Sequence, residues 1–229
     1  MMMTYLFVYG LLTVADIMLY SIIEKSSFLK TPGVVGVLTP RYRAVNIVKS
    51  FVLLLCSVPC LYIMFDVVYL GTLPVEMTHV AGAIYASLDM SALIYNPYNH
   101  ISTNVHHVAV QLMYYYCLYH NWDSNTLSKP IVVYASFSAW AYLVNGRLAV
   151  RQVKMNSLLR TVIALVALTV YSLCCLSNWS FQVYLLLNNS YDYTVVYISC
   201  LGFIIYDDLK LLRYLYTSSV VNKVYKKLA

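Results

Sequence analysis

The sequence predicts an all-α fold, a polytopic bundle of about seven transmembrane helices in a single domain over residues 1–229. Two observations indicate this class. Hydrophobic residues make up 61% of the chain and charged residues 10%, with a mean hydropathy of +0.69, whereas a soluble domain carries roughly a quarter charged residues. Apolar runs also recur at about the 20-residue length that a membrane-spanning helix needs, separated by short polar connections.

The predicted spans follow the apolar runs in order. The first run lacks the basic start and small-residue cleavage site of a signal peptide, so we expect it to remain as the first helix. Pro59 lies inside the second run, Pro97 separates the third from the fourth, and Pro130 starts the fifth, where a proline is tolerated. The predicted spans are residues 4–23, 45–66, 76–95, 101–120, 128–147, 157–177 and 192–213.

The basic residues predict the orientation, because Lys and Arg stay on the cytoplasmic side of short loops. With seven spans, 14 of the 15 basic residues fall on one side and only Lys129 falls on the other. The N-terminus is then lumenal or outside, and the C-terminus is cytosolic. The 14 residues are Lys25, Lys30, Arg41, Arg43, Lys49, Arg147, Arg151, Lys154, Arg160, Lys210, Arg213, Lys223, Lys226 and Lys227.

Short motifs add to this topology. The glycosylation patterns Asn178-Trp-Ser and Asn188-Asn-Ser both fall between the sixth and seventh predicted spans, in a loop expected to be lumenal. The chain ends in KKLA, so Lys226 and Lys227 match a di-lysine retrieval signal and favour the endoplasmic reticulum over the plasma membrane. The six cysteines lie within apolar runs, where cysteine behaves as a small hydrophobe, so we expect neither a disulfide framework nor a bound metal.

Ionisable residues inside apolar spans are costly and mark functional sites by default. Asp89 lies in the third predicted span, and His106 and His107 lie in the fourth. At 1.5 Å per residue all three are about 8–9 Å from the cytosolic end, so we expect them to be neighbours. Adjacent helical residues point about 100° apart, so at most one histidine can face a given partner.

Polar residues near the cytosolic ends of three other spans fall in the same third of the bundle. We expect Asp16, Asn145, Arg147, Asp207 and Asp208 to converge with the first three in the cytosolic third of the bundle. Structural pairing between helices and snorkelling toward the interface are the alternative interpretations of these residues. Other classes fit poorly: the chain has five histidines, too few for the clustered boxes of a di-iron lipid hydroxylase, and no Gly-rich phosphate loop.

Several segments together resemble the TLC-domain membrane proteins, which include the ceramide synthases. GAIYASLDMSALIY aligns Asp89 with the carboxylate of that family, and NVHHVAVQLMYYY aligns His106 and His107 with its histidine pair. SFSAWAYLVNGRLAV keeps Asn145 and Arg147 but lacks the usual Glu and Pro. RYRAVNIVKSFVLLL has Lys49 or Ser50 where a histidine is usual. The resemblance covers about residues 40–215 and is closer to the small TLC-only members, because the acidic run of true ceramide synthases is missing.

The resemblance and the polar cluster leave two lipid functions open, beside an unrelated receptor- or channel-like function of a seven-helix bundle. The first is a lipid-handling protein that binds membrane lipids or controls their composition through the polar pocket. The alternative is an acyl-CoA-dependent lipid N-acyltransferase of the ceramide synthase type, in which His106 or His107 acts as general base and Asp89 as its partner. Asp16, Asn145, Arg147, Asp207 and Asp208 would then bind lipid or CoA. Neither interpretation involves nucleic acid or a resident cofactor, acyl-CoA being a co-substrate.

Overall fold

The computed structural model describes residues 2–26, 40–96, 100–150 and 156–228, with side chains described up to residue 219. The part of the chain that it describes is helical and contains no strand, which confirms the all-α class. The elements are α1 Met2–Lys25, α2 Pro40–Phe65, η2 Asp66–Leu70, α3 Val75–Tyr95, α4 Ile101–Tyr119, α5 Ser128–Ser138, η3 Ala139–Ala141, α6 Tyr142–Val150, α7 Ser157–Asn188 and α8 Thr194–Leu228.

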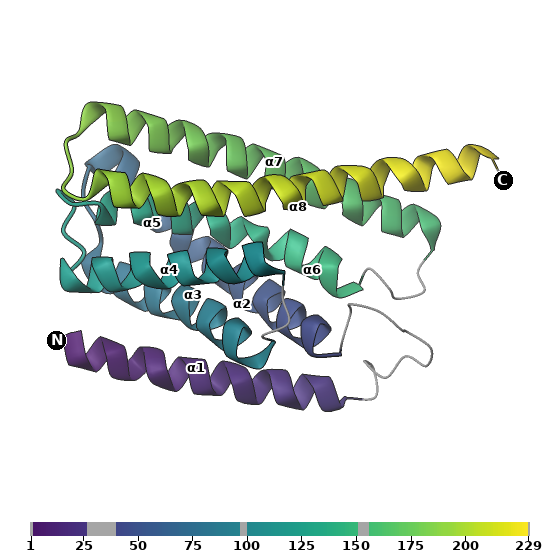
Figure 1. The fold of residues 1–229 in the computed structure, drawn as a ribbon, viewed down its shortest axis with the longest axis horizontal. Coiled ribbons are helices and arrows are strands. Elements are labelled where there is room, and N and C mark those ends of the chain that lie inside the picture. The colour runs from purple at the N-terminus through teal and green to yellow at the C-terminus, as the bar shows by residue number, and fades with distance from the viewer. Residues whose placement is uncertain (1, 27–39, 97–99, 151–155, 229) are drawn as a thin grey trace.

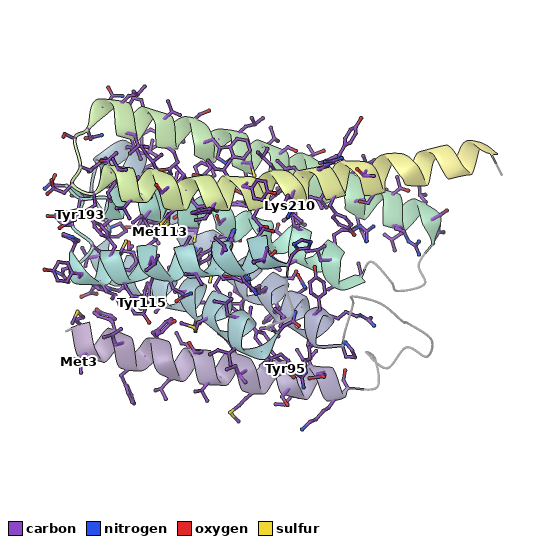
Figure 2. All side chains as sticks on the ribbon, in the orientation of Figure 1. Met3, Tyr95, Met113, Tyr115, Tyr193 and Lys210 are labelled. Carbon is purple, nitrogen blue, oxygen red and sulfur yellow. The ribbon has the colours of Figure 1, made fainter. Side chains whose placement is uncertain are left out.

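The helices run up and down along one common axis (Figure 1). Because α5, η3 and α6 follow one another without a break, they form one bent rod, and each rod runs opposite to the preceding one. α1 packs on α2 and α3, α4 lies between α3 and α8, and α7 packs on α5, α6 and α8. Tyr193 lies at the same end as Met3, whereas Tyr95 lies toward the other end (Figure 2). We call the end of the bundle that carries Met3 the N-terminal end, and we call the opposite end the basic end.

Within the described residues, three helices are long and apolar enough to cross a membrane, namely Met2–Lys25, Pro40–Leu70 and Ser157–Asn188. The other rods are less apolar because they carry the polar residues that face the interior, such as Asp89 on α3 and Gln111 on α4. Large apolar side chains on the outer surface, including Phe51, Leu173 and Phe203, are exposed as expected of side chains that face lipid. The chain is thus a helical protein with membrane-spanning character.

α7 is longer than the prediction of 157–177, and the difference has a physical reason. The polar stretch after residue 177 is typical of a loop, but its side chains make contacts between helices instead. Gln182 is 2% exposed. Its Nε2 donates to the carbonyl of Pro130 at 3.0 Å, and its Oε1 accepts from the hydroxyl of Tyr197 at 2.6 Å. These bonds satisfy the amide inside the bundle, so the helix continues to Asn188.

This extension corrects the placement of one glycosylation pattern. Asn178 lies within α7 rather than in a loop, is 4% exposed, and accepts a hydrogen bond from Gln182 at 3.2 Å. A glycan cannot be attached to a buried side chain. Asn188 is the exposed last residue of α7 and is the only one of the two patterns whose acceptor side chain is accessible.

The fifth predicted span is a bent rod rather than one straight helix. The turn Ala139–Ala141 is a 3₁₀-helix between α5 and α6, and Ser138 Oγ donates back to the carbonyl of Tyr134 at 3.0 Å. Such back-bonding to the preceding turn often bends helices. The bend matters because Ala141 at this point lines the central cavity described below. The six cysteines are free thiols, in agreement with the prediction of no disulfide.

Candidate functional site

A cavity of about 410 Å³ lies inside the basic half of the bundle. Its walls come from α2, α3, α4, α7, α8 and the bent rod, while α1 contributes no lining residue. The lining residues that carry charge or can acquire it are Lys49, Asp89, His100, His106, His107, Asp207, Asp208 and Lys210. The cavity also reaches Asn178, ten residues before the C-terminal end of α7, so it extends deeper than the predicted cytosolic third.

Asp89 is the centre of one polar cluster, in which three helices meet. Lys49 Nζ on α2 donates to Asp89 Oδ1 on α3 at 2.6 Å. His107 Nδ1 on α4 lies 3.1 Å from the same oxygen. Asp89 and His107 are each 6% exposed and Lys49 is 9% exposed. The paired charges therefore sit in a region of low dielectric, where their mutual attraction offsets a large desolvation cost.

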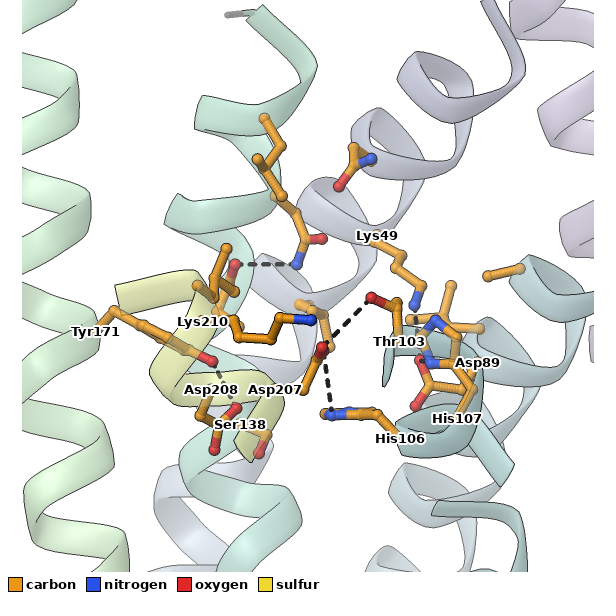
Figure 3. Close-up of a pocket in the computed structure, with 18 of the residues that line it drawn as sticks. Lys49, Asp89, Thr103, His106, His107, Ser138, Tyr171, Asp207, Asp208 and Lys210 are labelled. Atoms are coloured by element: carbon orange, nitrogen blue, oxygen red, sulfur yellow. Dashed lines mark hydrogen bonds and ion pairs between the residues drawn. The ribbon is translucent and has the colours of Figure 1, made fainter. Parts of the chain in front are cut away.

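His106 points to a different partner, as the 100° separation between adjacent helical residues requires. Its Nδ1 lies 3.7 Å from Asp207 Oδ2 on α8. Asp207 also accepts from Thr103 Oγ1 at 3.4 Å, and Lys210 Nζ donates to Ser102 Oγ at 3.0 Å. These contacts join the first turns of α4 to α8 across the cavity (Figure 3). The two adjacent histidines thus contact different carboxylates: His107 lies next to Asp89, and His106 lies next to Asp207.

Asp208 forms the second polar cluster on the opposite wall. Its carboxylate accepts hydrogen bonds from Tyr134 at 2.5 Å and from Tyr171 at 2.7 Å. The two tyrosines come from α5 and α7, so three helices meet at this carboxylate on α8. Asp208 is 6% exposed, and both tyrosines line the same cavity. Two phenol donors satisfy one oxygen each, which makes a buried carboxylate tolerable.

The structure brings six of the eight predicted site residues to the cavity: Asp89, His106, His107, Asn145, Asp207 and Asp208. Asp16 and Arg147 do not line it. Asp16 on α1 accepts from Ser87 Oγ at 2.9 Å, behind α3. Arg147 is buried at 4% exposure, which is inconsistent with a solvated residue at the interface. Asn145 donates to the carbonyl of Ala141 at 3.0 Å, within its own helix region.

Lys49 is the main residue that the sequence prediction placed elsewhere. It counted among the basic residues of the cytosolic side, but it lies inside the bundle and pairs with Asp89. The available signal was its position within an apolar run, where a lysine needs a partner carboxylate. Tyr134 and Tyr171 were also missed, because tyrosine is common in this chain, with 24 copies, and spacing gave neither a special role.

A smaller apolar cavity of about 60 Å³ lies next to the first one, toward the N-terminal end. Tyr85 and Tyr134 line both cavities and stand between them. Its other walls are apolar or weakly polar, among them Cys60, Ala86 and Met113. The lining therefore changes from charged in the larger cavity to apolar in the smaller one.

The chain matches no protein-family model, and neither a curated protein nor a solved structure shows a match. The resemblance to the TLC-domain proteins therefore rests on the aligned motifs alone and stays a prediction.

Proposed function

We propose that the protein handles membrane lipids by binding a polar lipid headgroup in the 410 Å³ cavity, and through this controls lipid composition. The observation that carries the proposal is a charged cavity inside a bundle whose outer surface is apolar. Charged groups inside a membrane-spanning bundle are costly, so they persist where a function uses them. An amphipathic ligand, with one polar and one apolar end, fits a charged cavity inside an apolar bundle.

The composition of the cavity supports a headgroup with both donors and acceptors. Asp89, Asp207 and Asp208 offer carboxylates, whereas Lys49 and Lys210 offer ammonium groups. Such a lining can bind an amine at one wall and an anionic or hydroxyl group at another, because its charged groups come from three helices, α2, α3 and α8. The adjacent apolar cavity beyond Tyr85 offers space for the first part of a hydrocarbon chain.

The proposal includes a membrane arrangement. We propose seven spans with the basic end in the cytosol, a lumenal N-terminus, and residence in the endoplasmic reticulum. This orientation is supported by the helix termini that carry Lys25, Arg41 and Arg160, which all lie at the basic end of the bundle. The positive-inside rule requires such basic residues on the cytoplasmic side. The side chains of Lys226 and Lys227, which form the di-lysine pattern, lie outside the described part.

A second candidate function is acyl transfer from acyl-CoA to a lipid amine, as the resemblance implies. The specific observation in its favour is the contact of 3.1 Å between His107 Nδ1 and Asp89 Oδ1. A carboxylate in this position orients an imidazole and stabilises its cation when the ring removes a proton from the attacking amine. Arg160 could attract CoA phosphates at the basic end, while Arg151 and Lys154 lie outside the described residues.

One experiment separates the two candidates. The wild type and the variant His106→Ala/His107→Ala are purified in detergent, and co-purifying lipids are measured by mass spectrometry. Both are then incubated with acyl-CoA and candidate lipid amines. His120→Ala serves as the matched control, because His120 follows the far end of α4 and does not line the cavity. The lipid-handling proposal is supported if only the double variant loses its co-purifying lipid and the wild type forms no N-acyl lipid.

The other outcomes are equally informative. An N-acyl lipid made by the wild type and by His120→Ala, but not by the double variant, establishes acyl transfer. If the double variant keeps the same lipid as the wild type and neither protein forms an N-acyl lipid, the histidine pair is structural and the proposal fails.

A further inference from the structure

We propose that Asp89, His106 and His107 together bind a divalent transition metal ion, for which zinc is the best fit. This site goes beyond the binding of a lipid headgroup and does not depend on it. One carboxylate oxygen and one nitrogen from each ring lie within 4.8 Å of one another. Two imidazoles and one carboxylate form the three-ligand set of many catalytic zinc sites, which keep a fourth position open.

The spacing of the donors is close to what zinc requires. Zinc bonds of about 2.0–2.1 Å in tetrahedral geometry place neighbouring ligand atoms about 3.3 Å apart. The separation of 3.1 Å between His107 Nδ1 and Asp89 Oδ1 already agrees with this value. The most distant pair must approach by up to about 1.5 Å from the 4.8 Å limit. The side chain of His106 is 17% exposed and that of His107 is 8% exposed, so we expect His106 to be the ring that rotates.

The unsatisfied atoms of these residues provide a second, independent observation. Within the described residues, Asp89 Oδ2 and His107 Nδ1 are buried and make no hydrogen bond. Asp89 and His107 are more than nine-tenths buried and line the cavity. Each unsatisfied buried polar atom costs about 1–3 kcal/mol. A metal ion would compensate both atoms at once.

Two neighbours would adjust the site. Asp207, at 3.7 Å from His106 Nδ1, is in the position of the outer carboxylate that orients metal-binding histidines. Lys49 has the opposite effect, because its ammonium group already pairs with Asp89 Oδ1 at 2.6 Å and repels a divalent ion. Lys49 and the metal therefore compete for one carboxylate. This competition gives the proposal a test in which a variant gains affinity.

Zinc binding to the purified, chelator-treated protein tests the site directly. We expect one zinc per chain by elemental analysis, and Co²⁺ titration should give the strong visible absorption of a tetrahedral centre. Asp89→Asn and His107→Ala should each weaken binding more than 100-fold, beyond the 10–100-fold effect of losing an outer partner. Lys49→Met should bind zinc more tightly than the wild type, and His120→Ala should bind it unchanged.

Two results would overturn the site. One is a wild type that binds no more zinc than the His106→Ala/His107→Ala variant. The other is a wild type and a Lys49→Met variant with equal affinity, since the ion would then bind elsewhere. Lipid content is measured separately on the same preparations, so zinc binding without a lipid ligand, or a lipid ligand without zinc, would show which proposal has failed.

Discussion

Asp89 has two roles in the molecule that depend on one carboxylate. It balances the ammonium group of Lys49, which would otherwise be a buried, unpaired charge, and it orients His107. Removing one partner of a buried ion pair typically costs about 3–5 kcal/mol, because the other charge stays behind without compensation. The helices α2, α3 and α4 should therefore lose their mutual support when either charge alone is removed.

Asp89→Asn tests this pairing. In chelator-treated protein we expect the variant to lose about 3–5 kcal/mol of stability, since Lys49 is left buried beside a neutral amide. The double variant Lys49→Met/Asp89→Asn should recover most of that loss, because no charge is left unpaired. Thermal unfolding in detergent measures both changes. A double variant that is as unstable as the sum of the two single variants would contradict the pairing.

The tyrosines around Asp208 allow a similar test on the opposite wall. Tyr134→Phe and Tyr171→Phe each remove one hydrogen bond to a buried carboxylate, which should cost about 1.5–3 kcal/mol. Tyr184→Phe is the matched control, because Tyr184 is exposed on the outer surface of α7. The midpoint of thermal unfolding is measured for each of the three variants and compared with that of the wild type. Equal midpoints for Tyr171→Phe and Tyr184→Phe would show that the bond to Asp208 contributes nothing.

At this scale the sequence predicted the residues that are unusual for their surroundings. A carboxylate and two histidines within apolar spans are unusual, so Asp89, His106 and His107 could be identified without a structure. Lys49 was missed despite its position within an apolar run, because a lysine near the cytosolic end of a span has a general explanation in the positive-inside rule. Tyr134 and Tyr171 could not be identified, because only the packing of α5 and α7 on α8 gives them a partner.

At the level of elements, hydropathy predicted where helices exist better than where they end. α3 and α4 agree with the prediction to within one residue, because the apolar runs end at polar turns. α7 does not, because Asn178 and Gln182 look like loop residues until their partners on other elements are known. The bend between α5 and α6 was also missed, since Ser138 and the Ala139–Ala141 turn carry no strong breaker such as proline.

The contact between α3 and Trp122 gives a prediction for an element. Gly82 on α3 lies directly under the indole of Trp122, so a Cβ at this position would clash with the ring. Gly82→Ala should therefore push Trp122 away and cost about 1–3 kcal/mol. Gly202→Ala on α8, where a Cβ meets open space, should leave stability unchanged or raise it. Tryptophan fluorescence and unfolding temperature measure the effect, and equal results for both variants would contradict the packing.

For the whole molecule, the alternating direction of the rods predicts which residues share a side of the membrane. Ser190 lies between α7 and α8, and Ser157 starts α7 at the basic end. In a background without native cysteines, Ser157→Cys in sealed endoplasmic reticulum vesicles should react with a membrane-impermeant thiol reagent from the cytosolic side. Ser190→Cys should react only after permeabilisation. The reverse pattern would invert the proposed orientation, and labelling of both before permeabilisation would contradict seven spans.

Native mass spectrometry tests whether a lipid binds in the cavity, because it counts the lipids that stay bound to each chain. Ala141 lines the cavity at the bend, so Ala141→Trp fills the space intended for a headgroup. Leu176→Trp places the same indole on the exposed outer surface of α7. We predict that the wild type and Leu176→Trp retain one tightly bound lipid per chain and that Ala141→Trp loses it. Equal lipid retention by all three proteins would mean that the lipid binds only on the outside, and would contradict the account.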